Sequence, residues 1–358
     1  MSLSIEHRTL RRRQAGDVLL WLIAGFHLLL LAALLAAVVT VKPANAAQEP
    51  QCRGVDLLAE MKGKDPAGYE KIMQEAAATP NGQGVLWKIE KPGISPSFLL
   101  GTMHVTDERV VNLSDKVQSA YRQANTVVIE SDEILDEKKV AAAFLARPDL
   151  TMYTDGTTLA SLLSKDNFAL LDEGLKKRGI PAAAVQRMRP WMLMSVLSVP
   201  SCEIARKAAG KQFLDQKLAV SALKDGKVVK GLETMIEQAE TMVSVPDKTQ
   251  LKSVIDTLKL GDKMNDVVET MTDLYLQENS GAIVPMLKAV NASPEDPEGD
   301  DDFEQRVIID RNKRMAERAQ PILEAGNALI AVGFLHLPGK QGLIERLRAE
   351  GFTVTAVD

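Results

Sequence analysis

Two histidines in matching surroundings are the residues of this chain best suited to chemistry. His104 follows the apolar run of Ser97–Thr106 (SFLLGTMHVT), and His336 follows that of Asn327–Gly339 (NALIAVGFLHLPG). Each run has the length of a strand and is followed by a glycine, two further residues and the histidine. The chain has four histidines, and the other two lie within its first 46 residues. We therefore expect the rest of the chain to bring the imidazoles of His104 and His336 together.

A glutamate is placed by the sequence to join them. A glycine that ends a buried strand lets the backbone turn sharply, and a side chain three residues later can point over the carboxyl edge of the sheet. Glu130 ends the buried-type strand TVVIE. Two neutral imidazoles and a carboxylate suit a divalent transition ion, which would lower the pKa of bound water and polarise a carbonyl. We expect His104, His336 and Glu130 to be metal ligands; the alternative for Glu130 is a carboxylate that caps the following turn.

The hydrophobic pattern predicts an α/β (α+β) fold with one central mixed sheet flanked by helices. Strands joined by helical stretches form two βαβ-like units, at about 84–135 and 303–358. Between them, residues of about 137–290 have mostly helical periodicity, and Trp191–Ala209 is expected to be one apolar helix. Residues 47–358 are therefore predicted to form a single domain with a mostly helical insertion.

The first 46 residues have the composition of an export segment. Arg11–Arg13 precede Val18–Val41, an uncharged run whose helix would be about 36 Å long, enough to span a bilayer. Ala44 and Ala46 have the spacing of a signal-peptidase site. Residues 1–46 are thus either a cleaved signal peptide or a membrane anchor. In both cases the positive charges stay inside, so we expect the remainder to be exported, periplasmic or otherwise extracytoplasmic, and to meet the membrane only through this segment.

Charge and cysteine content narrow the classes of partner. The chain carries a net charge of −5, and its first 46 residues hold five basic and two acidic residues, so the remainder carries −8. Such a charge argues against nucleic acid or anionic lipid as a partner. Cys52 and Cys202 are the only cysteines. In an oxidising compartment they are a candidate disulfide across a loop of about 150 residues; two unpaired buried thiols are the alternative.

A series of short motifs resembles the TraB/GumN family, which also includes PrgY and the Tiki proteins. In chain order they are Leu100–His104 (LGTMH), Val128–Asp132 (VIESD), Gly231–Thr234 (GLET) with Gln238, Arg311-Asn312 with Met315, and Gly333–Leu337 (GFLHL). Cys52–Gly54 (CRG) and Arg189–Trp191 (RPW) also resemble features of the GumN branch. The resemblance covers the chain from about residue 51 to residue 358, with the motifs in the family's order.

The resemblance implies a fold similar to that of erythromycin esterases and ChaN-like proteins. It also implies that His104, His336 and Glu130 take metal-centre roles. Tiki relatives are metal-dependent proteases, supported by manganese or cobalt, that clip the N-terminal region of Wnt ligands. PrgY and TraB are linked to shutting down peptide pheromone activity, and GumN sits with exopolysaccharide genes without an assigned reaction. Bulky Phe334 and Leu335 stand where many GumN relatives have smaller residues, which we expect to narrow the pocket.

Two further motif residues are candidates for catalytic roles. Arg311 lies on the long helix expected before the last core strand, where its guanidinium could hold Glu130 or a substrate carboxylate in a bidentate pair. A solvent-facing arginine is the alternative. Glu233 follows the strand KVVKGL and could be a ligand, the general base, or the N-terminal carboxylate of the helix that begins near Thr234. The last of these roles is slightly favoured.

These features support two hypotheses. The first is an exported metal-dependent hydrolase, using Mn, Co, Zn or Fe, that acts on a peptide or protein while Glu130 or Glu233 handles the proton. The second is a non-catalytic envelope protein that binds a peptide or another envelope component and needs the histidines for structure or recognition. Metal content separates the two hypotheses, because only the first requires a bound ion.

Overall fold

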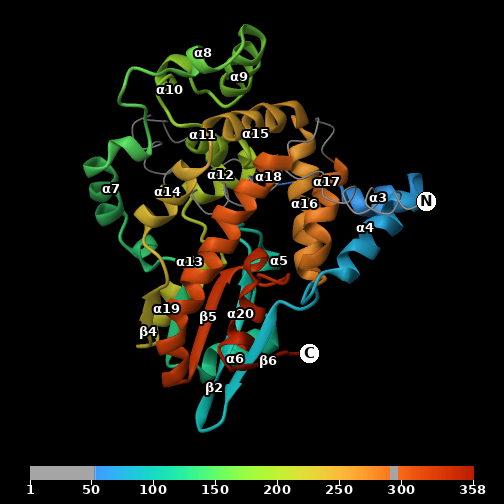
Figure 1. Cartoon of the computed structure of the whole chain (residues 1–358), viewed down its shortest axis with the longest axis vertical. Coiled ribbons are helices and arrows are strands. Elements are labelled where there is room, and N and C mark those ends of the chain that lie inside the picture. The colour runs from blue at the N-terminus through green and yellow to red at the C-terminus, as the bar shows by residue number, and fades with distance from the viewer. Residues whose placement is uncertain (1–51, 53, 291–296) are drawn as a thin grey trace, which may run out of the picture.

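The structure is a computed structural model that describes residue 52, residues 54–290 and residues 297–358 (Figure 1). The predicted export segment, residues 1–46, lies outside this part. Among the residues described, no helix combines the length and the apolar character needed to cross a membrane.

A six-stranded mixed sheet occupies the lower part of the molecule in Figure 1. Its strands lie in the order β4-β3-β5-β2-β1-β6. The four strands from β4 to β2 run parallel, whereas β1 pairs antiparallel with β2 and with β6. The bounds are β1 (Leu86–Lys91), β2 (Ile94–Thr102), β3 (Thr126–Ile129), β4 (Val228–Gly231), β5 (Ala328–Gly333) and β6 (Thr353–Ala356).

The mixed α/β class is confirmed, but the two expected units are interleaved. β5, from the C-terminal unit, lies between β2 and β3 of the N-terminal unit, and β6 lies at the far edge against β1. All six residues of β5 are buried, and a continuous apolar strand is stable only where both faces of a sheet are covered. The strand before His336 therefore lies directly between the strand before His104 and the strand before Glu130.

Helices make up most of the remaining chain. They are α3 (Leu57–Lys64), α4 (Pro66–Ala78), α5 (Glu108–Val111), α6 (Asp115–Gln123), α7 (Glu137–Ala146), α8 (Leu159–Leu162), α9 (Lys165–Lys177), α10 (Ala182–Val185), α11 (Pro190–Leu197), α12 (Ser201–Ala208), α13 (Leu214–Lys224), α14 (Met235–Ser244), α15 (Asp247–Leu260), α16 (Lys263–Leu276), α17 (Ile283–Val290), α18 (Pro297–Phe303), α19 (Arg311–Ala325) and α20 (Leu343–Ala349). A π-helical stretch, Glu304–Asp310, joins α18 to α19. The single helix expected over 191–209 is broken into α11 and α12, because Pro200 cannot donate the hydrogen bond of a helix interior.

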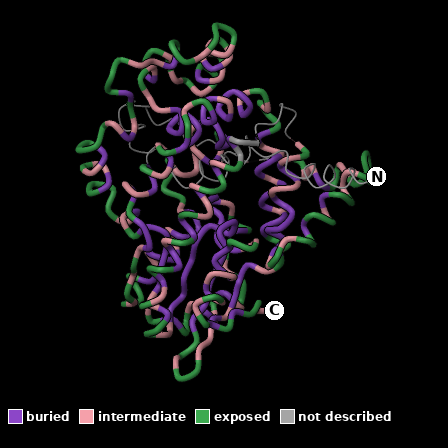
Figure 2. Tube along the Cα trace, in the orientation of Figure 1, coloured by how far each residue is buried: buried purple, intermediate pink, exposed green. Residues whose placement is uncertain are grey.

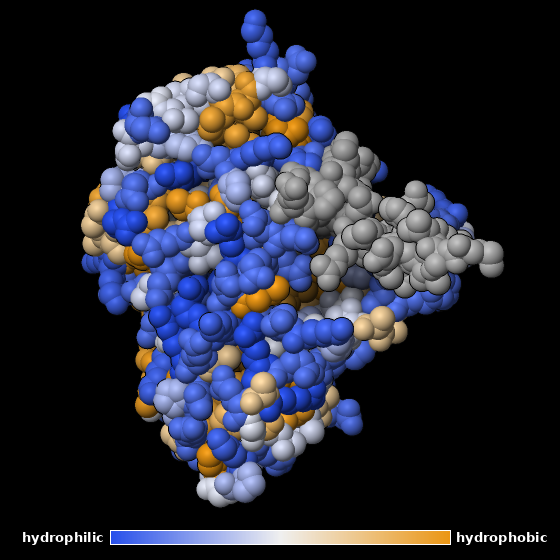
Figure 3. Space-filling view, viewed as in Figure 1, coloured by the Kyte–Doolittle hydropathy of each residue, from blue (hydrophilic) through white to orange (hydrophobic). Residues whose placement is uncertain are grey.

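Two hydrophobic cores cover the two faces of the sheet. Along β5, Leu329 and Ala331 belong to the larger core, while Ile330 and Val332 belong to the smaller one, as the alternation of a strand requires. α19 and α20 close the smaller core, and α6, α13 and helices of the insertion close the larger one. Buried positions run from the sheet up into the helical part (Figure 2). The face shown in Figure 3 is mainly hydrophilic, with hydrophobic residues in separate patches.

Candidate metal centre

The three expected ligands follow three adjacent strands at one edge of the sheet. Thr102 at the end of β2 pairs with Gly333 at the end of β5, so His104 and His336 follow their strands from the same level. β3 pairs with the other side of β5, and Glu130 follows its last residue. The three side chains are buried, with 8%, 1% and 4% of their surface exposed, respectively. The structure thus places all three at the carboxyl edge of β2, β5 and β3.

The glycine of the first histidine motif serves close packing and not a turn. Gly101 lies within β2, and neither Gly101 nor Gly333 has a positive φ. A Cβ added at Gly101 would lie 2.7 Å from Cβ and 3.0 Å from Cα of Phe334. The hydroxyl of Tyr275 donates to the carbonyl of Gly101 (3.1 Å), and its ring meets that of Phe334 edge-on at 5.3 Å. Phe334 of the second motif can therefore pack against β2 because Gly101 of the first motif has no side chain.

The substitution Gly101→Ala is expected to lower the free energy of unfolding by about 1–3 kcal/mol, because the backbones of β2 and Phe334 must move apart. Urea denaturation of the purified protein measures this change. Gly63→Ala is the matched control, since a Cβ there meets no atom within 4 Å and alanine favours a helix. Equal stability of both variants would contradict the packing role.

His336 is held in one tautomer by a neighbouring amide. The Nδ2 group of Asn312 donates to the carbonyl of Gln341 (3.0 Å), which orients the amide oxygen toward the histidine ring. Nδ1 of His336 lies 2.7 Å from that oxygen, so Nδ1 carries the proton and Nε2 carries the lone pair. Nε2 lies 4.0 Å from Oε1 of Glu130. A buried basic nitrogen is therefore set beside a carboxylate oxygen.

The carboxylate of Glu130 is held at both oxygens. Oε1 accepts from the backbone N–H of Gly333 (2.8 Å). Oε2 accepts from Nη2 of Arg311 (2.6 Å) and from the amide of Gln238 (3.3 Å). Oε2 thus anchors the side chain, while Oε1 is the oxygen nearest to His336.

Arg311 and Glu233 form a buried ionic network behind Glu130. Nε and Nη2 of Arg311 donate to Oε2 of Glu233 (2.9 and 2.6 Å), and Arg314 donates to its Oε1. Burial by itself lowers the pKa of Arg311, but the carboxylates of Glu233 and Glu130 outweigh burial and raise that pKa above its ordinary value. Of the roles expected for Arg311, the structure shows the contact with Glu130; the solvent-facing alternative is wrong, since Arg311 is buried.

The slightly favoured role of Glu233, as the carboxylate at the start of the following helix, is wrong. At the N-terminus of α14, the side chains of Thr234 and Glu237 form a reciprocal capping box, and Glu133 accepts from the N–H of Met235 (2.8 Å). The side chain of Glu233 is instead buried between Arg311 and Arg314. The negative charge of Glu233 is compensated by the guanidinium groups of these two arginines.

His104 is paired with a carboxylate that the sequence did not single out. Its Nε2 lies 3.2 Å from Oδ2 of Asp215, and its ring centroid lies 5.1 Å from that of Phe213. Burial lowers the pKa of His104, but the charges of Asp215 and Glu130 outweigh burial, so the pKa is raised above its usual value. Glu130 is thus electrostatically coupled to His104 and also lies close to His336.

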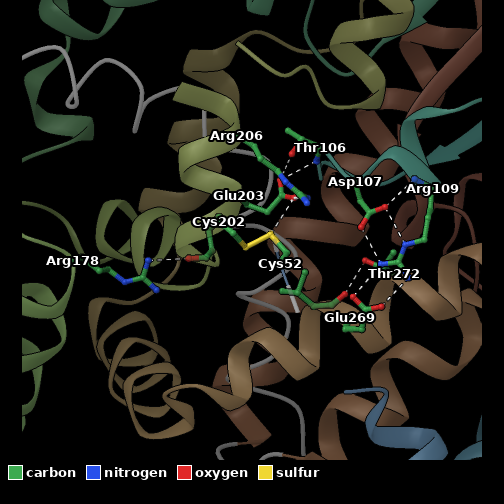
Figure 4. The surroundings of a disulfide bond; sticks show 12 residues. Cys52, Thr106, Asp107, Arg109, Arg178, Cys202, Glu203, Arg206, Glu269 and Thr272 are labelled. Atoms are coloured by element: carbon green, nitrogen blue, oxygen red, sulfur yellow. Dashed lines mark hydrogen bonds and ion pairs between the residues drawn. A yellow bond between two sulfur atoms is a disulfide. The ribbon is translucent and has the colours of Figure 1, made fainter. Parts of the chain in front are cut away.

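The segment after His104 is clamped by α12. Glu203 accepts from both the N–H and the hydroxyl of Thr106 (2.9 Å each), and Lys207 donates to the carbonyl of His104 (3.1 Å). Burial lowers the pKa of Lys207 to about 8, against the opposing charge of Glu203. Cys202, the residue before Glu203, is joined to Cys52 by the disulfide that the sequence predicts (Figure 4). The disulfide therefore ties the start of the described chain to the helix that holds the first histidine segment.

Comparison with known proteins confirms the family that the sequence resembles. The model of the TraB/PrgY/gumN family matches residues 85–356. The chain belongs to this family. It is 25% identical over 327 residues to a "Metalloprotease TIKI homolog" of Nematostella vectensis. The aligned region covers 77% of this chain and 68% of that protein. It is 24% and 25% identical to "Metalloprotease TIKI1" of Xenopus tropicalis and Danio rerio, over 75% of this chain and 60% and 62% of those proteins.

The chain therefore spans only about two thirds of the length of these Tiki relatives. No solved structure matches it. The similarity to erythromycin-esterase and ChaN-like folds thus stays a prediction.

The donors at the sheet edge fit a divalent transition ion in kind, since imidazole nitrogens and carboxylate oxygens are its usual ligands. They stand as two pairs, His336 with Glu130 and His104 with Asp215. Over the described part of the chain, no group of three or more His, Cys, Asp or Glu side chains is arranged to hold a metal ion. The fit therefore rests on the chemistry of the donors and not on one closed cluster.

The raised pKa of His104 predicts opposite pH dependences for stability and metal affinity. In the metal-free protein, the stability contributed by His104 is fully present below its ordinary pKa of about 6.5 and is lost as pH rises through the raised value. A metal ion needs the neutral ring, so the affinity for metal is expected to fall as pH decreases through that value. Denaturation and metal titration of wild type and His104→Gln, from about pH 5 to 9, measure both trends. Identical pH profiles for the two proteins would contradict the assignment.

Proposed function

We propose that this TraB/PrgY/gumN-family protein is a metal-dependent hydrolase that cleaves peptide bonds. The relatives named as metalloproteases support the reaction class. The observation that carries the proposal is the buried pair of His336 and Glu130, in which Asn312 leaves the lone pair on Nε2, 4.0 Å from Oε1. Backing of a histidine by an amide or carbonyl oxygen is the usual support of a metal-binding imidazole.

The chain's own residues would hold and orient the reacting groups. His104, His336 and Glu130 would hold the ion, and Asn312 would keep His336 in the ligating tautomer. A divalent ion held there supplies Lewis acidity, which polarises a carbonyl and lowers the pKa of water. We assign the proton-handling role to Glu130 and not to Glu233, because Oε1 of Glu130 lies 4.0 Å from Nε2 of His336, whereas Glu233 is enclosed by the guanidinium groups of Arg311 and Arg314.

We further propose that the protein works outside the cytoplasm on a peptide or protein. The disulfide between Cys52 and Cys202 supports this location, since disulfides persist in oxidising compartments. The apolar run of residues 18–41 would deliver the chain to that location as a signal or an anchor.

Metal content after reconstitution tests the proposal most directly. The purified protein is expected to take up a near-stoichiometric amount of Mn, Co, Zn or Fe, and His104→Ala and His336→Ala are expected to lose it. Asn312→Leu should weaken metal affinity about 10–100-fold, because it removes the acceptor that fixes the tautomer of His336. Elemental analysis and competition with a chelator report these changes. Equal metal content in wild type and both histidine variants would overturn the proposal.

Cleavage of a peptide library then separates a hydrolase from a binding protein. Cleavage that stops with chelator, returns with added metal and is absent in His336→Ala supports the hydrolase. A metal-loaded protein that binds peptides of the library but leaves them intact would favour the binding protein.

A further inference from the structure

We propose that Asp215 is a metal ligand that acts with His104, so that each of the two motif histidines has a carboxylate beside it at the centre. This inference rests on the proposed function, because it adds a ligand to the same centre. It concerns a residue outside every motif that pointed to the site. The geometry around His104 carries it.

The spacing of the two donor atoms is that of neighbouring ligands. Nε2 of His104 and Oδ2 of Asp215 lie 3.2 Å apart. With both ligand bonds near 2.1 Å, two ligands of one ion lie about 3.0 Å apart at a right angle and about 3.4 Å apart at the tetrahedral angle. The observed separation falls between these values, so one ion can contact both atoms with little movement of either side chain.

The carboxylate of Asp215 is held in place by a hydrogen bond to one of its two oxygens. Thr102, the last residue of β2, donates its hydroxyl to Oδ1 (2.9 Å). That contact leaves Oδ2 as the oxygen that faces His104. Apart from the His104 ring, no hydrogen-bond donor within the described residues reaches Oδ2. Buried carboxylate oxygens are normally satisfied by donors or by a metal ion, and Asp215 is only 3% exposed.

The backbone also favours a charged carboxylate at this position. Asp215 is the second residue of α13, an 11-residue helix, and a negative charge is stabilised in the first turn of a helix. α13 packs against β3, the strand that leads to Glu130. The helix therefore carries a carboxylate oxygen to the same edge of the sheet as the three ligands expected from the sequence.

The two pairs are alike in chemistry but differ in support. His336 is backed by the amide of Asn312, and its partner carboxylate, Glu130, is anchored by Arg311 at the other oxygen. The partner of His104, Asp215, is anchored by a hydroxyl at the other oxygen. In both pairs one carboxylate oxygen is held by a side chain while the other lies beside an imidazole nitrogen; in Glu130 this second oxygen also accepts from the N–H of Gly333. Within the described residues these four side chains stand as two pairs and not as one closed cluster, and their nitrogen and oxygen donors are of the kinds that suit Mn, Fe, Co or Zn.

Metal binding by Asp215→Asn is the first test, because the change keeps the size of the side chain and removes its charge. Affinity for Co²⁺ and Zn²⁺, measured by titration against a chromophoric chelator, is expected to fall more than about 100-fold, beyond the effect of losing an outer hydrogen-bond partner. The matched control is Asp256→Asn, which removes the charge of another buried carboxylate, on α15, where it forms ion pairs with Lys252 and Lys259. Wild-type affinity in Asp215→Asn would overturn the inference.

A substituted ligand gives a positive signal that a structural role cannot produce. Asp215→Cys would be the only free thiol, because Cys52 and Cys202 are joined. Its Co²⁺ form is expected to show a sulfur-to-cobalt charge-transfer band in the near ultraviolet, absent from wild type and from Asp256→Cys. A cobalt-loaded Asp215→Cys protein without this band would overturn the inference even if Asp215→Asn folds poorly.

The outcomes also separate this inference from the proposed function. If wild type takes up no metal, the proposed function itself is wrong. If wild type binds metal and the histidine variants do not, while Asp215→Asn binds normally, only the role of Asp215 is wrong.

Discussion

Replacing Arg311 with methionine is expected to lower the free energy of unfolding by about 3–5 kcal/mol, the largest effect of any single substitution that we predict for stability. Arg311 is 3% exposed and donates to two buried carboxylates, those of Glu130 and Glu233. Methionine fills most of the volume but leaves Glu130 without a guanidinium partner. An uncompensated buried charge is much less stable than the intact network.

Denaturation in urea, with circular dichroism as the signal, measures the effect of Arg311→Met. The control on the same helix is Arg318→Met, which breaks a partly exposed pair with Glu237 and should change stability by about 0–1 kcal/mol. Combining Arg311→Met with Glu130→Gln and Glu233→Gln should recover part of the lost stability, because no buried charge is then left unpaired. A similar small loss for Arg311→Met and Arg318→Met would show that the network contributes little.

Removing the disulfide is expected to have the second largest effect. The double substitution Cys52→Ser and Cys202→Ser should lower the free energy of unfolding by about 3–5 kcal/mol, because the bond closes a long loop in the unfolded chain. The two cysteines are 150 positions apart. The bond also holds the N-terminal turn of α12. This helix carries Glu203 in its first turn and Lys207 in its last turn. We therefore expect the variant to bind metal more weakly as well, since the segment of His104 loses part of its support.

Reduction of the wild-type protein provides the control for this prediction. A thiol reductant should lower the stability of wild type toward that of the serine variant and leave the variant itself unchanged. Thiol titration establishes that both cysteines have been reduced. Fully reduced wild type with unchanged stability would show that the cross-link does not stabilise the fold.

Local patterns predicted the strands, the ends of the strands and the chemistry placed there. The apolar runs before His104, Glu130 and His336 are β2, β3 and β5, and each of the three residues follows the end of its strand. These features can be predicted from the sequence because a buried strand is a short continuous apolar segment whose end is marked by glycine or a charge. The disulfide could be proposed from the sequence because Cys52 and Cys202 are the only two cysteines in the chain.

The side chains that contact His104 and His336 could not be predicted from the sequence. Asp215 is one acid in a helical stretch, and Asn312 attracted notice only through its motif. Their contacts with His104 and His336 span 111 and 24 positions of the chain, respectively. Periodicity within a window of one helix carries no information about such contacts. The mistaken role of Glu233 has the same origin, because a glutamate beside a helix start suggests a local cap, whereas distant arginines enclose it in the fold.

The sequence by itself determined that two Gly-x-x-His segments and a glutamate follow apolar runs of strand length, and the family model matches the part of the chain that holds them. Tertiary structure alone decided that β5 enters between β2 and β3, which brings Glu130 close to His336 and within electrostatic reach of His104. The order of strands in a sheet depends on which segments bury best at its centre, and burial is a property of the whole packed chain. The same packing placed Asp215 beside the first histidine and a guanidinium behind the glutamate.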